Sequence, residues 1–139
     1  MRGNMKQLSS SLEDYLECIY NYIKKNGAVK AVEISKTLGV SRASVTEALN
    51  KLAQEKYINY GRYENITMTN LGIKKAEEIL EKHAVLQSFF ENTLGVGNNE
   101  STEIACKIEH IISTEILERI RKLNTFCQSE IDFVEKYIK

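Results

Sequence analysis

Three residues in the second half of the chain have side chains that can bind a transition metal. Cys106, Glu109 and His110 lie in the segment CKIEH, at spacing i, i+3, i+4. On an α-helix this spacing places the thiol, the carboxylate and the imidazole on one face. Sulfur, oxygen and nitrogen donors of this kind suit a divalent first-row metal. The spacing alone is consistent with a metal site and with an ordinary polar helix face.

Further candidate ligands lie outside this segment. Asp14 and Glu17 are three residues apart in the first predicted helix, so they share a face. His83 falls inside a long predicted helix. The ordinary alternatives are two solvated carboxylates near a helix N-terminus, where the helix dipole favours them, and a packed or solvated histidine.

Residues 32–52, VEISKTLGVSRASVTEALNKL, predict a helix-turn-helix. Gly39 ends the first helix because glycine adopts positive φ without a Cβ clash, and Ser41 can cap the second. The second helix has one apolar face, and its other face carries groups suited to base edges and phosphates. The alternative is a helical hairpin with a solvated polar face. The residues predicted to contact DNA are Ser41, Arg42, Ser44, Thr46, Glu47, Asn50 and Lys51.

A short β-hairpin follows the second helix. Tyr57 to Tyr60 and Ile66 to Met68 predict its strands, and Gly61 to Asn65 its turn. A hairpin directly after a recognition helix is a wing, and Arg62 at its tip is added to the predicted DNA contacts. Glu64 beside it weakens that contact, and a hairpin that only packs on its own domain is the alternative.

Apolar residues at helical spacing predict helices in the remainder of the chain. The later helices are short and apolar on one side, so they suit burial against each other and against a second copy. The first predicted helix starts with a capping box, at Ser10–Glu13 or Ser11–Asp14, and ends at Gly27. A bridge helix of about residues 70–93 is capped by Thr69, and a helix of about residues 100–112 is capped by Asn99 or Ser101. A further helix is capped by Ser113, and the last one starts at Ser129 with Asp132.

Composition bounds the class of protein. Apolar residues make up 42% of the chain, enough for a packed core, but no apolar run is long enough to cross a membrane. The N-terminus lacks the apolar stretch of a signal peptide, so a cytoplasmic location is expected. Three widely spaced cysteines, an odd number, predict reduced thiols and no disulfide framework.

The net charge of zero hides a division along the chain. Residues 1–75 carry 12 Lys and Arg against 7 Asp and Glu, a net +5, whereas residues 76–139 carry 7 against 12, a net −5. Only the front half is therefore expected to meet a polyanion. We predict a mostly α protein, with a winged helix-turn-helix DNA-binding domain over residues 1–70 and an all-helical metal-binding and dimerisation domain over residues 71–139.

The chain resembles the diphtheria toxin repressor family of metal-dependent regulators, in particular its short manganese-responsive branch. Four segments carry the resemblance in the expected order: LEDYLECIY, EISKTLGVSRASVTEALNKL, TNLGIKKAEEILEKHAVL and CKIEHIIS. They span roughly residues 8–123. The resemblance implies a winged-helix domain and a dimerisation domain, without the SH3-like third domain of longer members.

The resemblance also implies a ligand set. Asp14 stands where the manganese branch has an aspartate and the iron branch a methionine. Cys106 is the departure, because the manganese branch has a glutamate there and the iron branch a cysteine. Gln87 and Thr102 replace two ancillary ligands of the iron branch, so that ancillary site is expected to be incomplete. The implied ligands are Asp14, Glu17, His83, Cys106, Glu109 and His110, with one strong site from Asp14, Cys106, Glu109 and His110 and a second around Glu17 and His83 that shares Glu109.

The chemistry of these donor atoms indicates which metal ions the site prefers. Carboxylates suit Mn(II), whereas a thiolate at Cys106 favours Fe(II), Co(II) or Zn(II). Mn(II) or Fe(II) is the expected cofactor, with Co(II) or Zn(II) as alternatives. The implied function is repression of metal-uptake genes by a homodimer on a two-fold symmetric operator. The competing hypotheses are a winged-helix regulator that responds to a small molecule, and a metalloenzyme; we expect no enzymatic activity.

Overall fold

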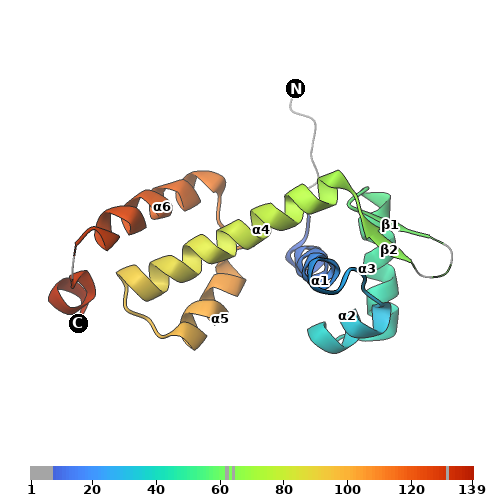
Figure 1. Cartoon of the computed structure of the whole chain (residues 1–139), viewed down its shortest axis with the longest axis horizontal. Coiled ribbons are helices and arrows are strands. Elements are labelled where there is room, and N and C mark those ends of the chain that lie inside the picture. The colour runs from blue at the N-terminus through green and yellow to red at the C-terminus, as the bar shows by residue number, and fades with distance from the viewer. Residues whose placement is uncertain (1–7, 62, 64, 131) are drawn as a thin grey trace, which may run out of the picture. The chain divides into compact units, whose positions relative to one another are not determined.

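The computed structural model describes residues 8–61, 63, 65–130 and 132–139. Two compact units make up the chain, residues 1–78 and 79–139, and the boundary falls within helix α4 (Asn70–Ser88). The α-helices and strands of each unit are labelled in Figure 1.

The first unit is a helix-turn-helix followed by a hairpin. It contains α1 (Ser10–Asn26), α2 (Ala31–Leu38) and α3 (Arg42–Gln54), then the antiparallel strands β1 (Ile58–Tyr60) and β2 (Ile66–Met68) (Figure 1). The predicted winged helix-turn-helix is confirmed.

Local capping explains where these helices begin and end. Ser41 caps α3 by accepting a hydrogen bond from the Ser44 N–H at 3.1 Å. Gly27 and Gly39 end α1 and α2 with φ of +79° and +65°, as predicted. Ser9, rather than Ser10 or Ser11, caps α1, because its hydroxyl accepts from the Leu12 N–H at 3.2 Å.

The core of the first unit forms on the inner faces of its three helices and the hairpin. Tyr15 and Leu16 of α1 are both buried. On α2 the buried residues are Ala31 and Ile34, whereas Val32 is 38% exposed. The fully buried side chains of this core include Leu16, Ile19, Ile34, Val45, Leu49, Leu52 and Ile58.

The start of α4 packs directly on Tyr57, the residue that precedes β1. Thr69 caps α4 by accepting from the Gly72 N–H at 3.0 Å, as predicted. The Thr69 N–H also donates to the Tyr57 carbonyl oxygen at 3.2 Å. A Cβ at Gly72 would overlap that oxygen and would lie 2.9 Å from the Tyr57 carbonyl carbon. Tyr57 itself donates its N–H to Leu52 O at 3.0 Å, so β1 begins one residue later than predicted.

The second unit is helical. After α4 it contains a π-helical turn, η2 (Phe89–Thr93), then α5 (Asn98–Ile108), α6 (Thr114–Gln128) and a second π-helical turn, η3 (Val134–Ile138). The bridge helix is therefore α-helical only to Ser88, and α5 both begins and ends earlier than predicted.

Two serines beside α6 have different roles. Ser113 caps α6, as predicted, by accepting from the Ile116 N–H at 3.2 Å. Ser129 ends α6 instead of starting another helix, because its hydroxyl donates to Phe126 O at 2.6 Å.

The second unit has its own apolar core and a buried polar contact. Thr93 Oγ1 donates to Asn124 Oδ1 at 2.7 Å, and this contact joins η2 to α6. The core residues are Val85, Leu86, Ala105 and Leu117, with Phe90, Ile108, Ile112 and Ile120 packed against them. Exposed large apolar side chains of this unit include Ile111, Ile116, Leu123 and Phe126, which lie on or beside α6.

Candidate functional site

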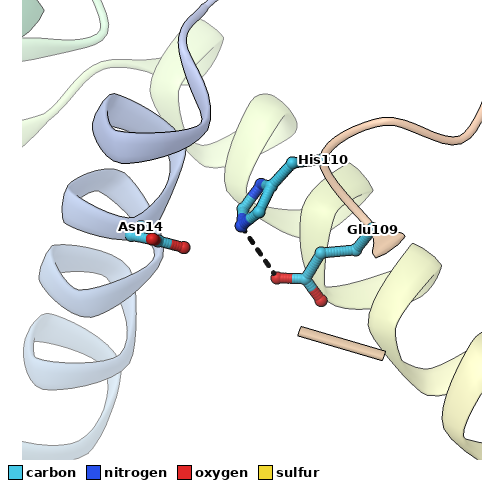
Figure 2. A group of neighbouring side chains, drawn as sticks. All are labelled: Asp14, Glu109 and His110. Atoms are coloured by element: carbon cyan, nitrogen blue, oxygen red, sulfur yellow. Dashed lines mark ion pairs between the residues drawn. The ribbon is translucent and has the colours of Figure 1, made fainter. Parts of the chain in front are cut away.

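Four of the six predicted metal ligands meet in the second unit. His83 comes from α4, Cys106 from α5, and Glu109 and His110 from the turn directly after α5. His83 Nδ1 lies 2.8 Å from Glu109 Oε2 and 3.7 Å from Cys106 Sγ. On the other side of the carboxylate, His110 Nε2 lies 3.6 Å from Glu109 Oε1 (Figure 2).

The end of α5 explains how these residues share a site although the helix stops early. The prediction that the helix continues to residue 112 is wrong, because α5 ends at Ile108. Glu109 nevertheless keeps helical dihedrals, φ −54° and ψ −29°, and its N–H donates to Ala105 O at 2.9 Å. One further turn of helix-like backbone therefore preserves the shared face of Cys106 and Glu109.

The electrostatics of this cluster centre on a buried carboxylate. The Glu109 side chain is 1% exposed, and those of His110 and His83 are 7% and 18% exposed. A buried carboxylate is costly unless donors or cations surround it, and both imidazoles face this one. Cys106 lies at the solvent-exposed edge of the cluster.

The donor set fits a divalent transition metal. Ligand bonds to such an ion are about 2.0–2.3 Å long, so donor atoms bound to one ion lie roughly 3–4 Å apart. The separations of 3.6 Å and 3.7 Å fall in that range, and the 2.8 Å contact between His83 and Glu109 is a hydrogen bond. Imidazole nitrogen, carboxylate oxygen and thiol sulfur together suit Mn(II), Fe(II), Co(II) or Zn(II).

The two remaining predicted ligands belong to the first unit. Asp14 is exposed and projects from α1 (Figure 2). Glu17, one turn further along the helix, is half-buried. Cys18 is next to Glu17, but burial, with a further contribution from the Glu17 charge, raises the pKa of its thiol to about 11. A thiol that stays protonated at neutral pH is a poor metal ligand, so Cys18 does not add to the donor set.

The predicted DNA-contacting face of α3 is open to solvent. All seven residues predicted on it, from Ser41 to Lys51, are exposed. Glu47 and Lys51 form an ion pair at 3.1 Å, and such an exposed pair is easily opened by a phosphate. Arg62 lies outside the described residues.

The sequence analysis did not name Tyr63, in the turn of the wing, among the candidate DNA contacts. Tyr63 is 97% exposed, with φ of +70°. An aromatic residue within the polar turn GRYEN was the available signal.

Family comparison covers most of the chain. Residues 7–66 match the family described as "Iron dependent repressor, N-terminal DNA binding domain". Residues 69–131 match "Iron dependent repressor, metal binding and dimerisation domain".

Individual relatives are also HTH-type transcriptional regulators. An uncharacterised HTH-type transcriptional regulator of Methanocaldococcus jannaschii is 43% identical over 115 residues, which cover 82% of this chain and 92% of the relative. The HTH-type transcriptional regulator MntR of Oceanobacillus iheyensis is 32% identical over 132 residues, 93% of this chain and 89% of the relative.

Solved structures show the same fold. The manganese regulator SloR superposes with a TM-score of 0.73 at 27% identity, and ScaR with bound Zn²⁺ with 0.71 at 30% identity. In both cases the match covers 83% of this chain and 54% of the solved chain, so this chain spans about half the length of those proteins. The chain belongs to the diphtheria toxin repressor (DtxR/MntR) family of metal-dependent, DNA-binding transcriptional regulators.

Proposed function

We propose that this protein represses metal-uptake genes in the cytoplasm when Mn(II) or Fe(II) binds to it. The cluster of His83, Cys106, Glu109 and His110 is the observation that carries this proposal. In it one buried carboxylate is flanked by two imidazoles, and a thiol lies 3.7 Å from the His83 ring nitrogen. The relatives named as MntR and as manganese regulators make a divalent metal the natural ligand. The protein acts by binding and not by catalysis.

The proposed ligand set takes donors from both units. Asp14 and Glu17 of α1 add two carboxylates to the four ligands of the second unit, and a bound divalent cation supplies the positive charge that lets these acidic groups share one site. Among the described residues no helix is both long and apolar enough to span a membrane.

Repulsion among the carboxylate ligands is proposed to make DNA binding depend on the metal. Three carboxylates, from Asp14, Glu17 and Glu109, repel one another when no cation is shared, and this repulsion opposes the DNA-binding arrangement. An active population that rises from about 1% to 99% needs a differential binding free energy of about 5.5 kcal/mol. Metal–ligand bonds supply that amount, whereas an exposed ion pair is worth about 1 kcal/mol or less.

The DNA-bound species is proposed to be a homodimer on a two-fold symmetric operator. Two α3 helices must then enter successive major grooves roughly 34 Å apart. The exposed apolar residues of α6, including Ile116, Leu123 and Phe126, supply the surface for a second copy.

The test compares ligand variants with a matched control. A DNA fragment is first selected from a random pool with the wild type and Mn²⁺, and binding is then followed by fluorescence anisotropy at one stated salt concentration. Glu109→Ala and His110→Ala are expected to lose the metal response and to remain dimers in sedimentation analysis. Glu103→Ala is the control, because Glu103 is an exposed carboxylate on α5 that pairs only with Lys107, at 3.4 Å, among the contacts described.

A full metal response in either ligand variant contradicts the proposal. The alternative, a winged-helix regulator that responds to a small molecule, predicts that the wild type binds no Mn²⁺, Fe²⁺ or Zn²⁺ tightly in equilibrium dialysis.

A further inference from the structure

The outer surface of α3 carries a strip of residues directly opposite its buried face. The inner face is formed by four buried residues, Val45, Ala48, Leu49 and Leu52. At about 100° of rotation per residue, the residues on the opposite side are Ala43, Glu47, Asn50 and Gln54, and all four are exposed. In a helix-turn-helix protein the N-terminal part of the second helix contacts base edges. Glu47 is therefore the first residue of this strip whose side chain can form a hydrogen bond with a base.

The hydroxyl groups near the start of α3 are engaged within the helix itself. Ser41 Oγ accepts from the Ser44 N–H at 3.1 Å and donates to Ser44 Oγ at 2.9 Å. Thr46 Oγ1 donates to the backbone carbonyl oxygen one turn earlier, at 3.1 Å. The Glu47 side chain, by contrast, is 69% exposed, and its Oε1 lies 3.1 Å from Lys51 Nζ. An exposed ion pair of this kind contributes little stability, so Glu47 can exchange it for a contact with a base.

A carboxylate restricts the base that it can contact. An ionised carboxylate only accepts hydrogen bonds. In the major groove guanine presents two acceptors and thymine an acceptor and a methyl group, whereas cytosine presents the donor N4. Adenine also has a donor, N6, but its acceptor N7 lies beside it and repels a carboxylate oxygen. Cytosine is therefore the base that a carboxylate at this position of α3 favours.

We propose that Glu47 is a specificity-determining residue, which reads one cytosine in each half of the operator by accepting a hydrogen bond from the N4 amino group. The inference rests on the proposed function and deepens it, because it names a base that α3 selects. Lys51 has a different role. Its ammonium group lies beside the Glu47 carboxylate, where it offsets the repulsion between that carboxylate and the DNA phosphates and strengthens binding to every sequence.

The first experiment selects DNA from a random pool with the full chain, in the presence and in the absence of Mn²⁺. The wild type is expected to select cytosine at one position of each half-site. Glu47→Ala should accept any base there, and Glu47→Gln should prefer adenine, whose N6 and N7 suit a side-chain amide. Glu55→Gln is the matched control, because Glu55 is an exposed carboxylate at the end of α3 and outside the strip, so this variant should select the wild-type sequence.

The selected sequences decide the assignment. A wild-type base other than cytosine at the position whose preference changes in the Glu47 variants overturns the proposal. Unchanged base preferences in Glu47→Ala overturn it as well. Glu47 is exposed and lies opposite the core, so both of its variants are expected to fold.

The second experiment tests the N4 contact on the selected fragment. N4-methylcytosine still pairs with guanine, but a methyl group replaces the N4 hydrogen that faces the major groove. A mismatched base pair typically lowers affinity roughly 5- to 140-fold, and the wild type should lose affinity by a factor in this range when N4-methylcytosine replaces the selected cytosine. Glu47→Ala should bind the two fragments equally. Equal affinity of the wild type for both fragments, measured by fluorescence anisotropy at one salt concentration, refutes the contact.

Lys51→Met separates base reading from charge. This variant should bind all sequences about equally more weakly, and the slope of log affinity against log salt concentration should fall by about 1. It should keep the preference for cytosine. A Lys51→Met variant that loses this preference contradicts the assignment of the reading to Glu47.

Selection with and without Mn²⁺ distinguishes this inference from the proposed function. If the wild type selects the same sequence equally well without metal, the metal-dependent part of the proposed function fails, and the Glu47 variants still show which base is read. If the wild type selects a sequence only with Mn²⁺ and no Glu47 variant alters its preferences, the proposed function stands and this inference fails.

Discussion

Gly72→Ala tests whether the start of α4 and the hairpin approach as closely as the structure indicates. The added methyl group would overlap the carbonyl oxygen of Tyr57 and lie 2.9 Å from its carbonyl carbon, so backbone on one side must move. That movement breaks the two hydrogen bonds that Thr69 makes to Tyr57 O, from its N–H at 3.2 Å and its hydroxyl at 3.0 Å. The wing would then lose its attachment to α4.

The cost follows from these contacts. Two hydrogen bonds contribute about 0.5–1.5 kcal/mol each, overpacking costs about 1–3 kcal/mol, and the better helix propensity of alanine returns about 1 kcal/mol. The expected net loss is about 1–5 kcal/mol in the free energy of unfolding. At about 3–4 °C per kcal/mol for a chain of this length, the melting midpoint should fall by roughly 3–20 °C.

Thermal unfolding of the full chain, followed by far-UV circular dichroism, measures the effect. Gly61→Ala is the control, because Gly61 has no positive φ and a Cβ there meets nothing within 4 Å; its midpoint should stay close to that of the wild type. Thr69→Val keeps the backbone bond but removes the hydroxyl, which caps α4 and donates to Lys56 O at 2.7 Å, so it should also lower the midpoint. A Gly72→Ala midpoint equal to or above the wild-type value would refute the close approach.

Three further predictions concern the cysteines. Cys106→Glu restores the carboxylate of the manganese branch, so the ratio of Mn²⁺ to Zn²⁺ affinity should rise by on the order of tenfold, about 1.4 kcal/mol, in competition titrations; an unchanged ratio would remove the thiol from the ligand set. Cys106 is exposed whereas Cys18 and Cys127 are buried, so a thiol reagent should modify Cys106 first in the native protein, and added Zn²⁺ should slow that reaction; equal rates with and without Zn²⁺ would count against a bound thiolate. Burial, with the Glu17 charge, raises the pKa of Cys18 from an ordinary 9.0 to about 11, so the unfolded thiol releases its proton first as pH rises and the free energy of unfolding should decline between these values. Urea unfolding at several pH values should show this decline in the wild type and a weaker one in Cys18→Ala, and parallel curves would contradict the assignment.

Local sequence was sufficient to determine most of the backbone of the first unit. Ser41 caps α3 and Gly39 ends α2 through hydrogen bonds and dihedrals that involve only their near neighbours in the chain. The strand Ile66–Met68 likewise lies where its residues predicted it. The resemblance that runs through CKIEH also named the four residues that meet around Glu109.

Only tertiary packing decided which of several compatible local choices the chain adopts. Residues 31–38 allow either Ala31 or Val32 on the inner face, and contact with the rest of the unit buries Ala31. Residues 100–112 are compatible with one continuous helix, but α5 ends at Ile108.

The candidate site depends on the same kind of non-local information. Glu109 meets His83, 26 residues away in the chain, at 2.8 Å. Gln87 and Glu91 follow His83 at four-residue helical spacing, whereas Asn98 of α5 donates to Glu91 Oε1, at 2.7 Å, only in the folded chain. Capping and periodicity are properties of neighbouring residues, whereas burial and hydrogen-bond direction depend on groups that only the folded chain brings together.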